Sequence, residues 1–108
     1  MHIEFHTPEA EVKDWVLTYL RDKLLEFYHR DKEISAAHVY LRQPGQGESD
    51  KVCEVELTIF GDSVFVRTRA DSYEQASREA IEELEKLVEE QIRKQSEPPD
   101  EMVSTVKV

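Results

Sequence analysis

KVCEVELTIFGDSVFVRTRADSYEQASREAIEELEKL, residues 51–87, decides the fold, because it predicts strand, turn, strand and helix with almost no spacer. In residues 51–59 apolar side chains alternate with glutamates and a threonine, as in a half-buried strand. Gly61-Asp62 predicts a tight hairpin turn, since glycine readily adopts the positive φ that such a turn requires. The returning strand has two faces, with Val64, Val66 and Thr68 on one and Phe65, Arg67 and Arg69 on the other.

The helix that follows begins at a cap supplied by Asp71 or Ser72. Its apolar residues recur at steps of three and four, which predicts one buried face: Tyr73, Ala76, Ala80, Leu84, Leu87 and Val88. The periodicity ends beyond Lys94, and residues 96–108 form an acidic tail that we expect to be disordered.

Upstream of this stretch the chain predicts a strand, a helix and a further strand. Residues 2–6 alternate, and Thr7-Pro8-Glu9 predicts a helix start, because proline suits the first helical position. The expected helix runs to about His29 on one apolar stripe: Val12, Trp15, Val16, Tyr19, Leu20, Leu24, Phe27 and Tyr28. Residues 34–42 alternate again, and residues 43–50, with Pro44 and Gly47, predict a flexible hairpin loop.

The order β-α-β-β-β-α predicts an α+β two-layer sandwich formed by a single domain over residues 1–95. The first two strands should be parallel, joined by a helical crossover, and the rest of a four-stranded mixed sheet antiparallel. Both helices should lie on one face, since polar alternation leaves the other face wet. The residues expected to be buried are Val12, Trp15, Leu20, Leu24, Val55, Leu57, Ala80 and Leu84.

The composition limits the possible partners. The 108 residues carry a formal net charge of -10, which disfavours unaided attraction to nucleic acid or to an anionic membrane. Any RNA contact therefore requires a local basic patch. Cys53 is the only cysteine, which excludes an internal disulfide and suits a reducing compartment. Without a long apolar run or a secretion signal, we expect a cytoplasmic protein without membrane contact.

No group of residues predicts an enzyme, a cofactor, a metal or a small-molecule substrate. Cys53 faces inward and lacks a nearby base, so it is a core residue. His2 and His6 share a strand face, and His38 is expected on the neighbouring strand, but solvated or hydrogen-bonded roles are favoured over a zinc site. The glutamates of residues 82–90 are typical of a solvent-facing helix surface.

The chain resembles the bacterial ribosome hibernation-promoting factors, also called ribosome-associated inhibitor or sigma 54 modulation proteins. The resemblance rests on KLLEFYHRDKEI, AAHVYLR, EVELTIFGDSVFV and ADSYEQASREAIEELEKL, in that order, and covers about residues 1–95. It implies a short-form factor that binds ribosomal RNA of the small ribosomal subunit near the decoding centre. Such a factor occludes messenger and transfer RNA and holds ribosomes idle without turnover.

The resemblance also implies which residues bind ribosomal RNA. Basic residues are expected along the helix faces, where this chain has Lys23, Lys86, Arg93 and Lys94. Glu26, Glu89 and Glu90 stand where lysine is more typical. Arg67 and Arg69 could add phosphate contacts on the sheet, although pairing with Glu54 or Glu56 across the hairpin is the favoured interpretation.

Two functions therefore stay open from the sequence. The order of motifs favours a ribosome-associated factor. The net charge of -10 favours an interaction module of the same fold that binds a protein through its acidic helices or its open sheet face. A contiguous positive patch across both helices would support the first, and an unbroken negative helix layer the second. The sequence does not fix the oligomeric state.

Overall fold

The computed structural model describes residues 1–7, 12–43 and 50–96. Six elements follow one another along the chain: β1 (His2–His6), α1 (Asp14–Arg30), β2 (Ile34–Arg42), β3 (Lys51–Ile59), β4 (Asp62–Ala70) and α2 (Tyr73–Ser96). This is the predicted β-α-β-β-β-α order. Within the described ranges, neither helix is long and apolar enough to cross a bilayer.

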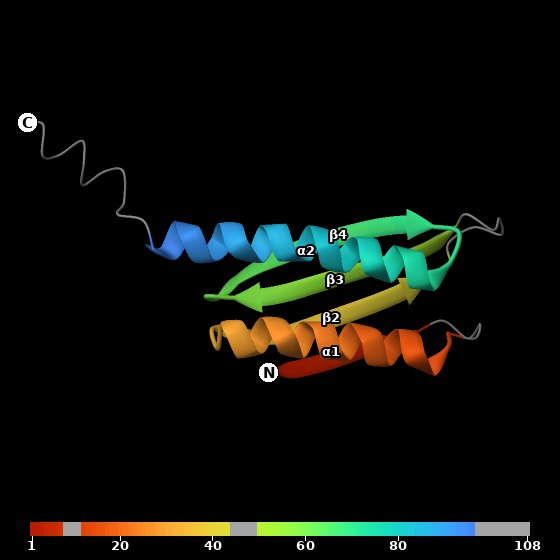
Figure 1. Ribbon diagram of the computed structural model, residues 1–108, viewed down its shortest axis with the longest axis horizontal. Helices are drawn as coiled ribbons and strands as arrows, with labels where there is room; N and C mark the ends of the chain where they lie inside the picture. The colour runs from red at the N-terminus through yellow and green to blue at the C-terminus, as the bar shows by residue number, and fades with distance from the viewer. Residues whose placement is uncertain (8–11, 44–49, 97–108) are drawn as a thin grey trace, which may run out of the picture.

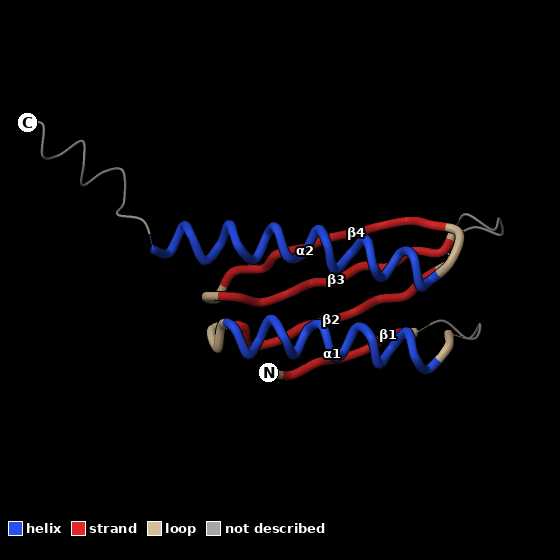
Figure 2. Tube along the Cα trace, viewed as in Figure 1, coloured by secondary structure: helices blue, strands red, loops and turns tan. Residues whose placement is uncertain are grey.

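The four strands form one sheet in the order β1-β2-β3-β4. β1 is parallel to β2, while β2–β3 and β3–β4 are antiparallel, as the sequence predicts. Figures 1 and 2 show α1 and α2 side by side across the same face of this sheet. The opposite face, called here the open face, is left without a covering element among the described residues.

The core lies between the helices and the sheet, where the predicted apolar faces of the strands and of the helices pack together. Every second residue of β3 from Cys53 to Ile59 is fully buried, because alternate side chains of a strand point to the same face. From the helices, Leu20, Leu24, Ala80 and Leu84 reach the same layer and are also fully buried. Six of the eight residues predicted to be buried are therefore confirmed.

Trp15 and Val12 are the two exceptions. Trp15 is 52% exposed, and Val12 is half-buried at the edge of the core. α1 begins at Asp14 and its buried line runs through Val16, Leu20, Leu24 and Phe27. Trp15 lies about 100° around the helix from Val16, on the side away from the rest of that line, because each residue advances by that angle. The predicted stripe was thus too wide at its amino-terminal end.

The start of α1 also differs from the prediction. Val12 and Lys13 are not helical, and Lys13 is an extended N-cap whose side chain makes no capping hydrogen bond. Of the predicted Thr7-Pro8-Glu9 start, Pro8 and Glu9 lie outside the described residues, as do Pro44 and Gly47 of the loop and residues 97–108 of the tail.

The hairpin between β3 and β4 turns one residue earlier than predicted. Ile59 pairs with Asp62, so the two turn residues are Phe60 and Gly61, and both have positive φ, 55° and 81°. A two-residue turn of this kind matches the twist of the strands. Phe60 adopts this conformation at a steric cost, and its ring packs against the core. At the other end of β4, Ser72 Oγ accepts a hydrogen bond from the Gln75 N–H at 3.2 Å, which confirms one of the two predicted caps of α2.

Truncating the central strand tests the assigned faces. Leu57→Ala should lower the free energy of unfolding by about 2–5 kcal/mol, because it leaves a cavity in a fully buried position. Trp15→Ala, which removes a larger but half-exposed side chain, should cost about 1 kcal/mol or less. Urea unfolding followed by circular dichroism measures both. Equal losses for the two variants would contradict the assignment.

Candidate functional site

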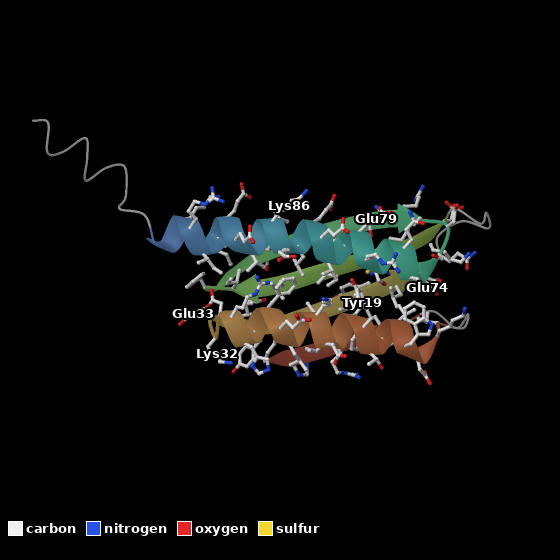
Figure 3. All side chains as sticks on the ribbon, viewed as in Figure 1. Tyr19, Lys32, Glu33, Glu74, Glu79 and Lys86 are labelled. Atoms are coloured by element: carbon white, nitrogen blue, oxygen red, sulfur yellow. The ribbon has the colours of Figure 1, made fainter. Side chains whose placement is uncertain are left out.

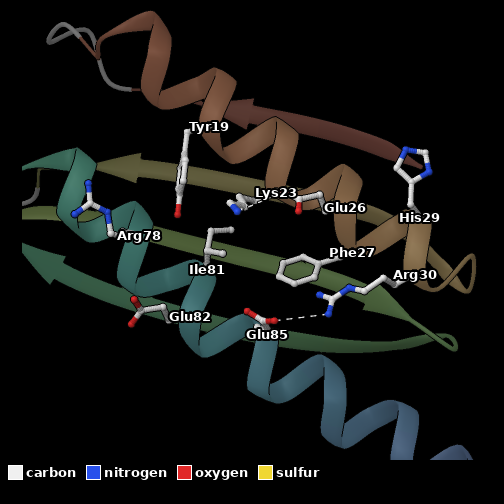
Figure 4. A pocket seen from close by; sticks show the side chains of 10 residues that line it. All are labelled: Tyr19, Lys23, Glu26, Phe27, His29, Arg30, Arg78, Ile81, Glu82 and Glu85. Atoms are coloured by element: carbon white, nitrogen blue, oxygen red, sulfur yellow. Dashed lines mark ion pairs between the residues drawn. The ribbon is translucent and has the colours of Figure 1, made fainter.

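The surface formed by α1 and α2, called here the helix layer, contains a hollow of about 450 Å³ between the two helices. Tyr19 and Phe27 on α1 and Ile81 on α2 contribute its apolar surface (Figure 4). Charged side chains surround them: the cations Lys23, Arg30 and Arg78 and the carboxylates Glu26, Glu82 and Glu85. The hollow is thus open, amphipathic and nearly balanced in charge.

Two of these cations are paired within the hollow. Lys23 Nζ lies 3.5 Å from Glu26 Oε2, one turn along α1. Arg30 Nη1 lies 3.6 Å from Glu85 Oε1, and this pair bridges the two helices (Figure 4). All four side chains are substantially exposed, and exposed pairs of this kind contribute about 0–1 kcal/mol each. An anionic ligand can therefore displace the carboxylates at little cost.

The predicted helix-layer cations do not form one contiguous patch. Lys23 lies in the hollow, whereas Lys86, Arg93 and Lys94 are exposed on α2 and do not line it. Lys86 projects from the side of α2 that faces away from α1 (Figure 3). Arg93 and Lys94 lie in the last turn of α2.

Arg30 and Arg78 line the hollow but were not among the residues singled out from the sequence. Each stands three residues from an apolar residue of the hollow, Arg30 from Phe27 and Arg78 from Ile81. Residues three apart lie on the same side of a helix. This spacing identifies the two arginines as residues of the hollow only once it is known which sides of the two helices face each other.

The two helices differ in formal charge. α1 has three acidic and three Lys or Arg residues, whereas α2 has seven acidic and four basic residues. Glu26 pairs with Lys23, while Glu89 and Glu90 are exposed on α2. The helix layer is therefore neither a contiguous positive patch nor an unbroken negative surface.

Arg67 and Arg69 lie on the open face, and both have carboxylate partners. Arg67 Nε is 3.5 Å from Glu54 Oε2, directly across the β3–β4 pairing. The other oxygen of Glu54 accepts a hydrogen bond from Arg42 Nε at 2.6 Å, so one carboxylate serves two guanidinium groups. Arg69 Nη1 is 3.7 Å from Asp50 Oδ1. The favoured interpretation, pairing across the hairpin, is confirmed for Arg67.

At the end of the open face where these arginines lie, one apolar side chain is buried more deeply than the strand alternation predicts. Val52 is fully buried although it lies outside the core cluster, and its neighbours in register are Arg42 and Arg69. Arginine stems commonly cover apolar surface while the charged head stays in water. Farther along β4, Phe65 is 53% exposed opposite Glu56.

Cys53 is a buried core residue, as predicted, and its surroundings suppress thiol chemistry. Burial raises the pKa of its thiol from the ordinary 9.0 to about 12, even though Ser77 Oγ donates a hydrogen bond to Sγ at 3.9 Å. The thiolate is the nucleophilic form, so this cysteine is inert near neutral pH.

Comparison with known proteins gives a family and a fold. The family model described as "Sigma 54 modulation protein / S30EA ribosomal protein" matches residues 3–97. A ribosomal subunit interface protein from Coxiella burnetii superposes with a TM-score of 0.73 at 15% identity, over 86% of this chain and 99% of that one. The N-terminal domain of Protein Y from Thermus thermophilus gives 0.67 at 22% identity, over 82% and 96%. At these identities the likeness shows the fold alone. No curated protein matches the chain.

The state of Cys53 predicts a chemical and a pH response. Iodoacetamide at pH 8 should leave the folded protein unlabelled by mass spectrometry and add one group per chain in urea. The pKa of the thiol is higher in the folded protein than in the unfolded chain. Its contribution to the free energy of unfolding is therefore fully present at any pH below the unfolded pKa. That contribution is then lost as the pH rises from about 9 toward 12. Cys53→Val, of similar volume, should remove this loss. Labelling of the folded protein at the rate seen in urea would contradict the burial.

Proposed function

Because this chain belongs to the Sigma 54 modulation protein / S30EA ribosomal protein family, we propose that it binds the small ribosomal subunit near the decoding centre and inhibits translation. Members of this family are ribosome-associated factors and not enzymes. The proposed action is steric, because the bound factor occupies space that messenger and transfer RNA need. It requires no cofactor and no turnover.

One observation carries the proposed docking surface: cations from both helices meet at a single hollow with apolar walls. Lys23 and Arg30 come from α1 and Arg78 from α2. Their exposed ion pairs are weak, so RNA phosphates can take the place of Glu26 and Glu85. Tyr19 offers an aromatic surface beside them, which suits contact with an unpaired base.

Lys86, Arg93 and Lys94 extend the proposed surface along α2. Each phosphate contact releases condensed counterions, so affinity depends on the number of cations engaged and falls steeply with salt. A chain with a net charge of -10 receives little help from long-range attraction. The association should therefore be weak, and more sensitive to salt than to the sequence of the RNA.

A protein partner is the second candidate, and the acidity of α2 favours it. Seven carboxylates on one helix, against four basic residues, suit a partner with a basic surface. In this case the same fold acts as a regulatory interaction module without affinity for ribosomal RNA.

Neutralising the helix-layer cations tests the docking surface. The variant with Lys23, Arg30, Arg78, Lys86, Arg93 and Lys94 all changed to glutamine should lose cosedimentation with purified small subunits at low salt. Each lost phosphate contact should lower the log–log slope of affinity against salt by about 0.7–0.9. The matched control is Arg67→Gln with Arg69→Gln on the open face, which should retain most of the binding.

The two sets of variants separate the possible outcomes. If only the variant with Arg67→Gln and Arg69→Gln lost binding, the docking surface would be the open face. An unmodified protein that stays off ribosomes at low salt would favour the second candidate. Both sets should stay folded by circular dichroism, because exposed charged residues contribute little to stability.

Reversing the acidic positions should have the opposite effect. Glu26→Lys, Glu89→Lys and Glu90→Lys together free Lys23 from its partner and add three cations to the helix layer. Cosedimentation should strengthen, and the salt concentration that releases half of the protein should rise. Unchanged release would show that docking does not involve the helix layer.

A further inference from the structure

Three of the four histidines gather around one carboxylate on the open face, at the edge formed by β1 and β2. His2 Nε2 lies 3.4 Å from Glu4 Oε2, and His38 Nδ1 lies 3.5 Å from the same oxygen. His6 Nε2 lies 3.7 Å from Glu4 Oε1. One potential ligand atom each from Glu4, His6 and His38 fits within 4.8 Å of the others. The cluster therefore offers three imidazoles and one carboxylate.

The sheet register produces this convergence. His2, Glu4 and His6 alternate along β1 and so share one face. The parallel pairing sets Glu4 directly beside His38 on β2. The chain thus brings together ligands that are more than thirty residues apart in sequence, without the helical H-x-x-x-H spacing or the cysteine pair by which zinc sites are commonly found.

The contacts of Glu4 with His6 and His38 suit a shared ion better than direct hydrogen bonds, whereas the 3.4 Å contact with His2 is an exposed hydrogen bond. Nitrogen–oxygen hydrogen bonds are commonly about 2.7–3.2 Å long, shorter than the contacts of Glu4 with His6 and His38. In a tetrahedral zinc site with metal–ligand distances of about 2.0–2.1 Å, neighbouring ligand atoms stand about 3.3–3.4 Å apart. The contacts of Glu4 with His38 and His6, at 3.5 and 3.7 Å, are close to that separation, and the ligand atoms of the three residues lie within 4.8 Å of one another.

One buried polar atom of the cluster also lacks a hydrogen-bond partner. His38 Nδ1 is buried and makes no hydrogen bond with the described residues. Three imidazoles compete for one carboxylate, and each such pair is an ion pair only when that histidine is protonated. A metal ion satisfies neutral imidazoles and the carboxylate together, since metal binding requires both to be deprotonated.

A stacked ring restricts the orientation of one ligand. The Tyr40 ring lies parallel to His6, with centroids 4.5 Å apart and an interplanar angle of 10°. The Arg42 guanidinium in turn covers Tyr40 at 4.8 Å. Such support around the ligands is typical of metal sites, where neighbouring groups hold the imidazole rings in position.

We propose that Glu4, His6 and His38 bind a divalent transition metal, with Zn²⁺ as the best fit. Two imidazole nitrogens and one carboxylate oxygen suit this ion in tetrahedral geometry, with a water molecule in the fourth position. The site is separate from the helix layer, because it lies across the sheet from α1 and α2. Its effect is structural: an ion held by both strands ties β1 to β2.

The test is a titration of the purified chain with Co²⁺ and with Zn²⁺. Co²⁺ should bind one per chain and give the intense visible absorption of a tetrahedral nitrogen–oxygen site, and Zn²⁺ should displace it. Saturating Zn²⁺ should raise the thermal midpoint by at least about 5 °C, since a ligand that binds only the folded state stabilises it.

Variants identify the ligands. His6→Ala, His38→Ala and Glu4→Gln should each weaken Co²⁺ binding by about tenfold or more. The matched control is His29→Ala, which removes the fourth histidine from α1, where it lies 3.3 Å from Lys32. It should leave the affinity and the spectrum unchanged. Thermal midpoints without metal identify any variant that fails to fold.

Three results would overturn the proposal. The first is a titration in which Co²⁺ gives no tetrahedral spectrum. The second is an equal loss of affinity in His29→Ala and His38→Ala. The third is binding that survives both His6→Ala and His38→Ala, which would place the ion elsewhere on this acidic chain.

Discussion

The packing of two helices against one face of a four-stranded sheet is the constraint on which the other features depend. β3 is central to it, because its inward residues from Cys53 to Ile59 are all fully buried between the sheet neighbours and the helices. The apolar sides of both helices pack against that single face of the sheet. Charged residues are consequently excluded from one face of the sheet and collect on two separate surfaces, the outside of the helices and the open face.

These two surfaces have different chemistry. The helix layer is hollowed between α1 and α2, and the ion pairs of its Lys23 and Arg30 are exposed and weak. On the open face, by contrast, charged groups contact one another: Glu54 contacts both Arg42 and Arg67, and Glu4 contacts three histidines. A surface with exchangeable pairs suits a large anionic partner, whereas a surface with converging ligands suits a small cation. The sheet between them allows both to coexist.

The sequence predicted the element order, the sheet topology and most of the core, because periods of two and of three to four residues report directly which side chains are buried. It misplaced Trp15 because an apolar residue beside a helix stripe looks like part of it, and it misplaced the hairpin turn because Phe60 is an unusual residue at positive φ. The roles of Arg30 and Arg78 depend on how two helices face each other. The gathering of His38 with Glu4 depends on a parallel register that no local pattern specifies.

β1 has a position in the sheet that affects how the molecule opens. Among the described residues it is a five-residue edge strand that pairs only with β2, and each of its residues is exposed or half-buried. Local opening of a protein begins where few apolar contacts oppose it. We therefore expect the amide protons of β1 to exchange with solvent through detachment of this strand alone, and those of β3 to exchange only when the whole sheet unfolds. Detachment leaves β2 as a new, uncovered sheet edge, to which another extended peptide can add.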